Sequence, residues 1–340
     1  MPKLNALIAG STGYIGVQLV KCLLKHKNVK IKYLCGNSSV GRKLSYYEKL
    51  PIFNKLPRII KFNNKLLKDV DLVFTALPYG EAQEISKHLL NKNTLIDLAA
   101  DFRLDDPKEF QKWYKIKHKL PRKIVNSIYA LPEISRNKIK NFDIIGCPGC
   151  YPTSALLPLI PLIKNNIISA NNIVIDSKSG YSGAGRGVHK KYKKKNLYES
   201  LSAYGLDYHR HSAEIYQELK KNTKSKVDFI FSPHLTPMFR GILTTIYVDL
   251  KKRQSIMKVL NVLKKTYKND HFIKIHKIDT PLSTNDVIHT NNCFISACRT
   301  RNKKRIIILS AIDNLIKGGA GQAIQNMNIK YGYNINEGLK

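Results

Sequence analysis

A glycine-rich turn between an apolar run and a helical pattern limits what this chain can fold into more than any other feature. The apolar run Leu4–Ala9 is followed by the turn GSTGYIG at residues 10–16, and then by residues 17–26, whose apolar positions have helical spacing. A second apolar run, Val29–Cys35, follows closely. Strand, turn, helix and strand form a βαβ unit, and its crossover connection makes the two strands parallel. The sequence therefore predicts that the chain begins with a parallel sheet.

The same turn is typical of a dinucleotide-binding site. Its glycines allow the backbone to approach a pyrophosphate, while the start of the following helix offers free N–H groups and a favourable dipole. Glycine triplets also occur at ordinary turns before helices, so the position after the first strand of a βαβ unit carries the interpretation. We expect the turn to bind a pyrophosphate through Gly10, Ser11, Thr12, Gly13, Tyr14, Ile15 and Gly16.

The end of the second predicted strand indicates which dinucleotide binds. Chains that bind NAD usually carry an acidic residue there, which holds the ribose hydroxyls. Here the segment is CGNSSVGRKL, at residues 35–44, and no acidic residue occurs before Glu48. The hydroxyls of Ser38 and Ser39 and the cation of Arg42 suit a 2′-phosphate, which favours NADPH over NADH. The alternative is that Arg42 and the lysine after it are two more surface cations.

Two further apolar runs extend the predicted sheet. Residues 69–77 and residues 93–99 are almost continuously apolar, and a helical pattern at residues 80–90 separates them. Strands that alternate with helices in this way form an open, doubly wound, mostly parallel sheet of the Rossmann type in an α/β protein. We assign this sheet to an NADP-binding domain, residues 1–149.

The sequence pattern changes after residue 149. The runs at residues 172–178, 226–232, 241–250 and 293–300 show more alternation of apolar and polar residues, and two helical patterns lie between them. Alternation is typical of a mostly antiparallel sheet with one face packed on helices. We therefore expect an α+β catalytic and substrate domain over residues 150–313, and a long helix near the C-terminus.

The composition indicates a folded protein that acts on small anions. The 340 residues are 43% hydrophobic and carry a formal net charge of +34, with Lys spread along the chain among Asn and Ile. Only residues 190–195 form a dense basic run, and the sequence shows no nucleic-acid-binding module around it. We therefore expect small anionic ligands, which a positive cleft concentrates, and no nucleic acid.

The sequence does not predict a membrane or secreted protein. The longest apolar stretches, such as residues 155–163, are short and contain prolines, whereas a membrane span needs about 20 apolar residues. The N-terminal apolar run reads better as a strand than as a signal peptide, because the small-residue cleavage pattern is missing. Six cysteines in a chain of this length do not indicate a disulfide scaffold. We expect a cytoplasmic protein.

The segment GCPGCYPTSALL at residues 146–157 places Cys147 and Cys150 three residues apart, directly before an apolar helical pattern. A zinc site would need a second pair of ligands at matching spacing, and Cys293 with Cys298, inside a predicted strand, is an unconvincing pair. A thioredoxin-type redox pair would need a different fold around it. A thiolate is stabilised at a helix N-terminus, where Cys150 lies. The sequence therefore favours Cys150 as a single nucleophile over a redox pair or a metal site.

A nucleotide-binding domain followed by a cysteine at a helix start suggests hydride transfer to or from a thioester. In such a reaction the thiolate attacks an activated acyl group, phosphate leaves, and a hydride converts the acyl carbon to an aldehyde. This chemistry needs a base for the thiol, donors for the oxyanion and cations for the phosphate. Any one histidine is more often structural, but three motifs in one domain hold such groups. They are YHRHSAEI with His209, Arg210, His211 and Glu214; SKSGYSGAGRG with Ser179, Ser182 and Arg186; and SPHLTPMFRG with His234 and Arg240.

Seven motifs occur in order along the chain: GSTGYIG, DLAADFRL, PGCYPTSALLPL, SGYSGAGRG, YHRHSAEI, PHLTPMFRGIL and NLIKGGAGQAIQNMN. Together they resemble the N-acetyl-gamma-glutamyl-phosphate reductases, a family related to the aspartate-semialdehyde dehydrogenases. The resemblance extends from Leu4 to about Gly332. It implies an NADP-dependent oxidoreductase of L-arginine biosynthesis. Such an enzyme converts N-acetyl-L-glutamyl 5-phosphate to N-acetyl-L-glutamate 5-semialdehyde and phosphate through a cysteine thioester.

The resemblance also implies roles for individual residues. It matches Cys150 to the nucleophile, which makes Cys147 a bystander, and it matches His209 and His211 to the pair that contains the general acid/base. It does not decide between these two histidines, which an extended segment would place on one face. We expect the substrate pocket to include Arg103, Ser182, Arg186, Glu214, His234 and Arg240. We expect further contacts to the cofactor from Leu77, Pro78, Asn314, Lys317, Gly318 and Gln322.

The resemblance extends to the quaternary structure and the C-terminus. Residues 314–340 are expected to form a helix that returns to the first domain and closes over the nicotinamide. The family implies a homodimer or homotetramer, formed through the sheet of the second domain.

Two positions depart from the pattern of many relatives. Cys147 stands where the cysteine motif often has Asn, so any help that the Asn amide gives in placing the thioester must be weaker here. Tyr79, in the ALPYG loop, stands where His is frequent, which puts a polar role there in doubt. Neither change removes a step of the mechanism.

Two alternatives remain open from the sequence. One is a sibling reductase that acts on aspartyl phosphate or on a carrier-linked aminoadipyl phosphate. The other is a basic nucleotide-binding or RNA-binding protein with an inactive site, against which the presence of Cys150, His209 and His211 argues.

Overall fold

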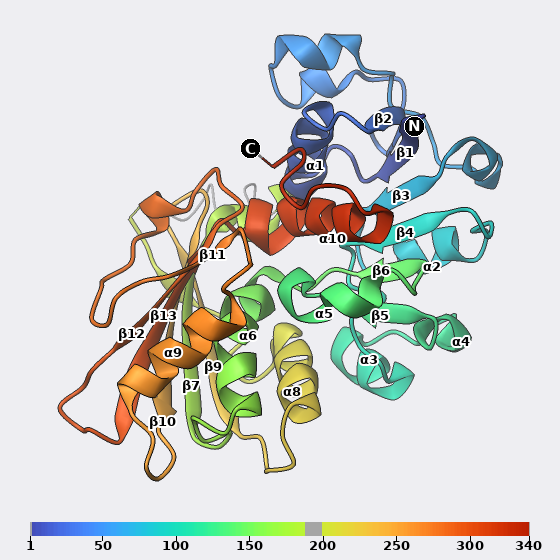
Figure 1. The fold of residues 1–340 in the computed structure, drawn as a ribbon. Coiled ribbons are helices and arrows are strands. Elements are labelled where there is room, and N and C mark those ends of the chain that lie inside the picture. The colour runs from blue at the N-terminus through green and yellow to red at the C-terminus, as the bar shows by residue number, and fades with distance from the viewer. Residues whose placement is uncertain (1, 188–198, 340) are drawn as a thin grey trace. The chain divides into compact units, whose positions relative to one another are not determined.

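The computed structural model describes residues 2–187 and 199–339, so the basic run at residues 190–195 lies outside the described residues. The chain divides into two compact units, shown as a ribbon in Figure 1. The first unit consists of Met1–Pro148 together with Gly319–Lys340, and the second of Gly149–Gly318. The sequence placed its domain boundaries after residues 149 and 313.

The first unit contains a six-stranded sheet in which every strand pair is parallel. Its order is β2-β1-β3-β4-β6-β5. The chain runs outward from β1 to β2 and then crosses to β3 on the other side of β1, so the order reverses between β1 and β3. This confirms the expected doubly wound sheet. The strands are β1 Leu4–Ala9, β2 Val29–Cys35, β3 Leu72–Thr75, β4 Thr94–Asp97, β5 Ser127–Tyr129 and β6 Ile144–Gly146.

Alternate side chains of these strands enter two cores, one on each face of the sheet. Ala6, Ile8 and Phe74 pack with the helices α1 and α10, whereas Leu7 and Val73 pack with α2 on the other face. Both faces are therefore covered, which explains why the strands are apolar throughout rather than alternating. The helices of this unit are α1 Tyr14–Leu24, α2 Glu81–Ser86, α3 Pro107–Tyr114, α4 Pro121–Ile124, α5 Pro132–Ile139 and α10 Gly321–Tyr331, and short 3₁₀ turns occur at Leu44–Tyr46, Pro51–Lys55 and Asn64–Asp69.

Strands β3 and β4 are shorter than the apolar runs that predicted them. Helix α2 ends four residues before the predicted end of the helix at residue 90. The carboxylate of Asp97 accepts hydrogen bonds from the backbone of Ala99 and Phe102, which turns the chain away from β4. Asp101 accepts from the backbone N–H groups of Gly80 and Ala82, which fixes where α2 begins. These contacts depend on polar side chains, and those of Asp101 also join distant positions, so apolar periodicity could not predict them.

The second unit contains a seven-stranded, mostly antiparallel sheet, as expected. Its order is β11-β12-β13-β10-β7-β9-β8, and only the pairs β7–β9 and β11–β12 among these neighbours are parallel. Helices α6, α8 and α9 lie along one face of this sheet in Figure 1. The strands are β7 Ile173–Gly180, β8 Ser202–Ala203, β9 Phe229–Thr236, β10 Ile242–Asp249, β11 Ile273–Ile275, β12 Cys293–Cys298 and β13 Arg305–Ile312. The helices are α6 Cys150–Lys164, α8 His211–Lys221 and α9 Ile256–Thr266, with 3₁₀ turns at Tyr181–Ala184 and Thr284–Asp286 and a short π-helix, Ile316–Ala320.

Helix α6 is the buried centre of the second unit despite two internal prolines, Pro158 and Pro161. Proline has no N–H to donate to the carbonyl four residues earlier. The hydroxyl of Tyr267 donates instead to the carbonyl of Leu157, the group that Pro161 leaves without its helical partner. The helix can therefore stay in an apolar core without an unpaired carbonyl at this position.

In the described ranges, no helix combines the length and the apolar character that crossing a membrane requires.

Candidate active site

The expected nucleotide turn joins β1 to α1 in the first unit. Gly10 has φ +84°, and a Cβ at this position would lie 2.2 Å from the carbonyl oxygen of Ala76. A side chain is therefore excluded both by conformation and by contact. Gly13 caps the helix with φ −67° and ψ 163°, and no side chain caps this end in the described structure. The first N–H groups of α1 remain directed at the turn, which is the arrangement that binds a pyrophosphate.

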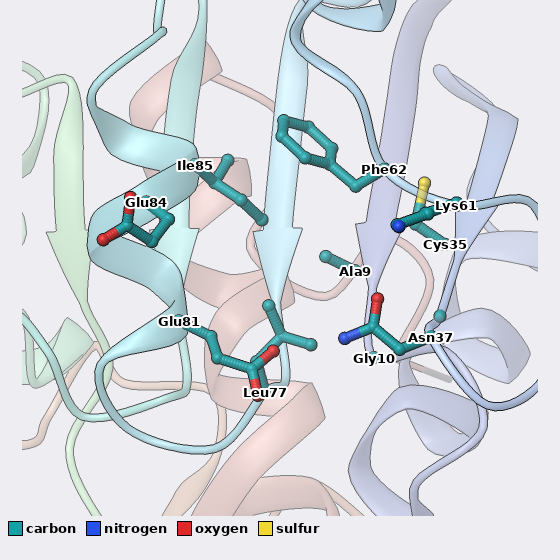
Figure 2. A pocket seen from close by; sticks show the side chains of 11 residues that line it. Ala9, Gly10, Cys35, Asn37, Lys61, Phe62, Leu77, Glu81, Glu84 and Ile85 are labelled. Carbon is teal, nitrogen blue, oxygen red and sulfur yellow. The ribbon is translucent and has the colours of Figure 1, made fainter.

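A cavity of about 330 Å³ lies beside this turn, at the carboxyl ends of β1, β2 and β3 (Figure 2). This is the edge where the strand order reverses, the position at which open parallel sheets bind their ligands. Figure 2 shows the side chains of Asn37, Leu77 and Glu81 around the cavity. The residues that line it are Ala9, Gly10, Cys35, Gly36, Asn37, Lys61, Phe62, Leu77, Glu81, Glu84 and Ile85.

Several of these lining residues were missed from the sequence. The Gly36–Asn37 pair directly after β2 is a signal that could have been used, because that turn borders the cofactor in parallel sheets. Lys61 and Phe62 carry no such signal. They reach the cavity because their segment runs beside β2, where Ile60 forms a bridge with Cys35.

The residues expected to bind a 2′-phosphate differ from one another in their exposure. Ser38 and Arg42 are exposed, and the Arg42 guanidinium lies 4.5 Å from the centre of the Tyr46 ring. Ser39 is buried, with its hydroxyl against Gly36. None of the three lines the cavity in Figure 2, and their role in cofactor choice stays a prediction.

The DFRL segment forms a buried polar loop after β4. Burial and the neighbouring Asp101 raise the pKa of Asp97 to about 6. Arg103, expected in the substrate pocket, is nearly buried and donates from Nη2 to the carbonyl of Leu98 at 3.1 Å. This loop belongs to the first unit.

Cys147 lies at the end of β6 and is fully buried. Burial raises the pKa of its thiol to about 12, so the thiol stays protonated at neutral pH. The Asn326 amide lies 3.5 Å from its sulfur, while among the described residues no donor reaches Oδ1 of Asn326. These surroundings suit a packed thiol rather than a nucleophile.

Cys150 is the first residue of α6 and is half-buried. Gly149 caps the helix with φ −66° and ψ 160°, and Thr153 donates to the Gly149 carbonyl from its backbone N–H and its hydroxyl, each at 2.9 Å. Gly318 packs so closely that a Cβ there would lie 2.6 Å from the Cβ of Cys150. The thiol therefore sits at the positive end of a fifteen-residue helix, and close packing holds the Cα and Cβ that carry it.

His211 lies directly against the residue that precedes this cysteine. A Cβ on Gly149 would fall 2.4 Å from Nε2 of His211, so only glycine admits the imidazole. Glu214 is fully buried, with Oε1 3.9 Å from that same nitrogen and Oε2 accepting from the Gly149 N–H at 2.9 Å. One carboxylate thus accepts a hydrogen bond from the start of the helix and lies near the histidine, while its expected place in the substrate pocket stays a prediction.

His209 differs from His211 in its surroundings. Burial, with a smaller effect of Arg210, lowers the pKa of His209 to about 4. Its Nδ1 accepts from the backbone N–H of His211 at 3.2 Å, which leaves any ring proton on Nε2. Arg210 has helical φ and ψ, so the segment is not extended, and the two imidazoles lie 4.8 Å apart. His209 is therefore neutral at physiological pH.

Other expected residues gather around the turn after β7. Asn314 donates from Nδ2 to the Ser182 hydroxyl at 3.0 Å and accepts from the Gly241 N–H at 2.7 Å. Arg240 forms an ion pair with the buried Asp313 at 3.0 Å. Arg186 is half-buried at the end of the same turn, and Lys317 is fully buried.

His234 occupies a third position in this unit. Its Nδ1 lies 3.2 Å from Asp176, and its carbonyl accepts from the hydroxyl of Tyr151. The second unit thus connects Cys150, His209, His211, Glu214 and His234 directly or through Tyr151. Arg103, Gln322 and the residues of the nucleotide turn belong to the first unit. Within the described ranges, no group of three or more His, Cys, Asp or Glu side chains could hold a metal ion.

Two family models match the chain. The semialdehyde dehydrogenase NAD binding domain matches residues 5–142, and the semialdehyde dehydrogenase dimerisation domain matches residues 150–314. Solved structures agree with this fold. Aspartate semialdehyde dehydrogenase II from Vibrio cholerae gives a TM-score of 0.72 at 15% identity over 98% of this chain and 99% of that one. The enzyme from Candida albicans gives 0.69 at 18% identity, with the same coverage.

Curated relatives are much more similar in sequence. The N-acetyl-gamma-glutamyl-phosphate reductase of Thermoanaerobacter pseudethanolicus is 41% identical over 98% of this chain and 96% of the relative. That of Campylobacter jejuni subsp. doylei is 41% identical over 99% and 98%. A probable chloroplastic reductase of the same name from Oryza sativa subsp. japonica is 39% identical over 98% and 80%. At this identity over nearly its whole length, the chain belongs to the N-acetyl-gamma-glutamyl-phosphate reductase family.

Proposed function

We propose that this protein reduces N-acetyl-L-glutamyl 5-phosphate to N-acetyl-L-glutamate 5-semialdehyde with NADPH and releases phosphate, a step of L-arginine biosynthesis. Its membership of the family supports the substrate, and the turn at residues 10–16 supports the dinucleotide. The observation that carries the proposal is the arrangement of Cys150, Gly149, His211 and Glu214. It places a thiol at a helix N-terminus beside an imidazole that a buried carboxylate holds.

The first chemical step forms a thioester on Cys150. The thiolate attacks the acyl carbon of the acyl phosphate, the carbon–oxygen bond to phosphate breaks, and phosphate leaves with the electron pair. The positive end of the α6 dipole, where Cys150 lies, stabilises the negative charge on the thiolate and on the tetrahedral oxyanion. When bound, NADPH supplies the hydride that converts the thioester to the aldehyde and releases the Cys150 thiolate.

His211 is the general acid/base in this proposal. Its imidazole lies against Gly149, next to the nucleophile, and the Glu214 carboxylate stabilises the imidazolium that forms when it takes the thiol proton. His209 is poorly suited, because a group with a pKa of about 4 is a weak base for a thiol. Instead, its ring nitrogen accepts a hydrogen bond from the backbone N–H of His211, which fixes the start of α8.

The remaining expected residues keep their roles as part of the proposal. Arg240 and Ser182 are held in place by Asp313 and Asn314, so they can meet an anionic substrate with little reorganisation. Arg103, Arg186 and His234 are further donors for its phosphate and carboxylate. In the first unit, the close packing of Gly10 and Gly16 shapes the turn beside the cavity, and this turn suits the pyrophosphate of NADP(H). Gly13, Leu77, Pro78, Gln322 and, from the second unit, Asn314, Lys317 and Gly318 are the other proposed cofactor contacts.

The sheet of the second unit is the proposed contact between copies of this chain, as a homodimer or homotetramer. Its helices cover one face, whereas the other carries the half-exposed side chains of Val174, Tyr247, Ile307 and Leu309, and Ile230 is 65% exposed. An apolar face of this kind is stabilised by a second copy. All six cysteines are free, which supports a reducing compartment such as the cytoplasm.

The test follows NADPH formation from NADP⁺ in the reverse direction, with N-acetyl-L-glutamate 5-semialdehyde and phosphate, for the wild type and for Cys150→Ser. We expect turnover that depends on phosphate and is lost in the variant. Aspartate semialdehyde in place of the acetylated substrate distinguishes the sibling reductases. No turnover from a wild type that binds NADPH, or preference for aspartate semialdehyde, would overturn the substrate.

A further inference from the structure

Tyr151, the residue after the nucleophile, is surrounded by aromatic rings. Its ring centre lies 5.7 Å from that of His209, 5.8 Å from that of His211 and 5.4 Å from that of Phe231, each in an edge-to-face arrangement. The side chain is only 2% exposed. Contacts of this type are directional and fix ring orientation in addition to burying area.

The hydroxyl end of Tyr151 is also fixed. It donates to the carbonyl of His234 at 3.2 Å and accepts from the hydroxyl of Tyr204 at 3.0 Å. Burial raises the pKa of Tyr151, so the hydroxyl is neutral and serves as an anchor rather than a proton carrier. The tip of the ring therefore cannot shift without breaking these hydrogen bonds, and the neighbouring rings limit its rotation.

The position of the Tyr151 backbone relates these ring contacts to the nucleophile. It belongs to the first turn of α6, directly after Cys150, whereas His211 is the first residue of α8. The Tyr151 ring thus joins the starts of the two helices that carry the nucleophile and the proposed acid/base. Glu214 forms a second link through the Gly149 N–H, but it holds the edge of the imidazole and not its plane.

We propose that Tyr151 is the positioning residue that sets the orientation of the His211 imidazole relative to the Cys150 thiol. This inference rests on the proposed function of His211. Loss of the ring leaves His211 free to turn about its side-chain bonds, so proton transfer from the thiol becomes slower while the cysteine itself stays in place.

The test measures the rate at which iodoacetamide alkylates Cys150 as a function of pH, with Cys150→Ser as the background. Tyr151→Leu removes the ring. The matched control is Phe231→Leu, which removes a ring of similar burial whose aromatic contacts in the described chain are to Tyr151 and His209 and not to His211. NADPH binding and the melting temperature report the fold of each variant.

We expect Tyr151→Leu to lower the alkylation rate at neutral pH by about tenfold and to move the pH midpoint upward, because the thiolate loses a correctly placed imidazole. Tyr151→Phe keeps the ring but loses its anchors, so a fall of about threefold is expected. Phe231→Leu should lower the melting temperature but leave the pH midpoint unchanged. If both leucine variants move the midpoint equally, or neither does, the proposal is wrong.

Two further outcomes remain informative. Where Tyr151→Leu does not fold, Tyr151→Phe decides, and an unchanged pH profile there overturns the proposal. Because alkylation needs no substrate, it tests Tyr151 even if the wild type fails to turn over the acetylated semialdehyde, which would overturn the proposed function alone.

Discussion

Helices α1 and α6 begin in almost the same way, although they lie in different units and serve different chemistry. Each follows a buried parallel strand and is capped by a glycine, Gly13 with φ −67° and ψ 163° and Gly149 with φ −66° and ψ 160°. In the described structure neither cap has a side chain that accepts from the first turn, whereas Asp106 caps α3 and Ser255 caps α9 in that way. Both helices therefore begin without a side-chain cap, and the positive end of each helix dipole faces its glycine turn.

The two starts differ in what occupies the space in front of them. Before α1 the turn is closely packed, since a Cβ on Gly10 or Gly16 would meet a carbonyl oxygen at 2.2 Å, and the cavity lies beside it. Before α6 the side chains of His211 and Glu214 fill the space, and a thiol stands on the first residue. We therefore expect the same helix end to bind an external anion in one unit and to stabilise an internal thiolate in the other. The surrounding residues decide which.

The largest effect is expected from Gly10→Ala, which disrupts the turn before α1. The new methyl group meets the Ala76 carbonyl, and the positive φ adds about 1–2 kcal/mol of strain. We expect NADPH affinity, measured by fluorescence titration, to fall by more than about 100-fold. Gly332→Ala is the control. Gly332 has φ +73° with open space around it, so this substitution adds the backbone strain without the steric contact. Unchanged NADPH affinity in Gly10→Ala would contradict this assignment of the turn.

Gly149→Ala disrupts the N-terminus of α6. Its methyl group would need the place of the His211 imidazole, and a displacement of about 1 Å at an acid/base costs about 100-fold in kcat. We expect that fall in steady-state kcat, with NADPH affinity within about twofold of the wild type, because the turn before α1 is untouched. A variant with normal kcat would show that His211 does not work from this position.

His209→Asn is expected to change how the free energy of unfolding depends on pH. The pKa of His209 is about 4 in the folded chain and about 6.5 when unfolded, so its contribution to the unfolding free energy is complete above about pH 6.5 and is lost as the pH falls towards 4. Between about pH 7.5 and pH 5 this loss is about 2 kcal/mol. Asp97, with its pKa raised to about 6, opposes it, since it gains stability as it takes up a proton.

The difference between two proteins isolates the histidine from Asp97. Denaturant unfolding of the wild type and of His209→Asn at both pH values should show a smaller decrease in the variant, by about 2 kcal/mol. Asn keeps an oxygen that can accept the His211 N–H, so the fold at neutral pH should be retained. Equal decreases in both proteins would mean that His209 is not buried as a neutral ring.

Cys147→Ser is expected to have the smallest effect. The hydroxyl can donate to Oδ1 of Asn326, and the thiol that it replaces is a buried group with a pKa of about 12. We expect kcat within about threefold of the wild type and a melting temperature within a few degrees, measured beside the inactive Cys150→Ser. Loss of turnover comparable to that of Cys150→Ser would mean that both cysteines take part.

The sequence predicts well what depends on local pattern. Strands β1 and β2 have the bounds expected from their apolar runs, and Cys150 lies at the helix start that its motif indicated. In contrast, β5, β6 and β11 have three residues each and β8 has two, too few for a periodicity to be visible. The parallel pair β7–β9 could not be predicted from alternation, because alternation does not encode strand direction.

The candidate site shows the same limit. The residue types of the YHRHSAEI motif indicated acid–base chemistry, but the choice between His209 and His211 depends on burial and on the packing of Gly149, which only the fold determines. Likewise, the role of Tyr151 depends on rings contributed by α8 and β9, and Lys61 and Phe62 reach the cofactor cavity only through a bridge beside β2.

The most direct test of the account is to mix the protein with N-acetyl-L-glutamyl 5-phosphate in the absence of NADPH and to map the acylated residue by mass spectrometry of quenched digests. We expect one acyl group per chain, on Cys150, with release of one phosphate. We also expect no acylation of Cys147, and loss of the acyl group from Cys150 when NADPH is added. Phosphate release without acylation of Cys150, or acylation of Cys147, would contradict the account.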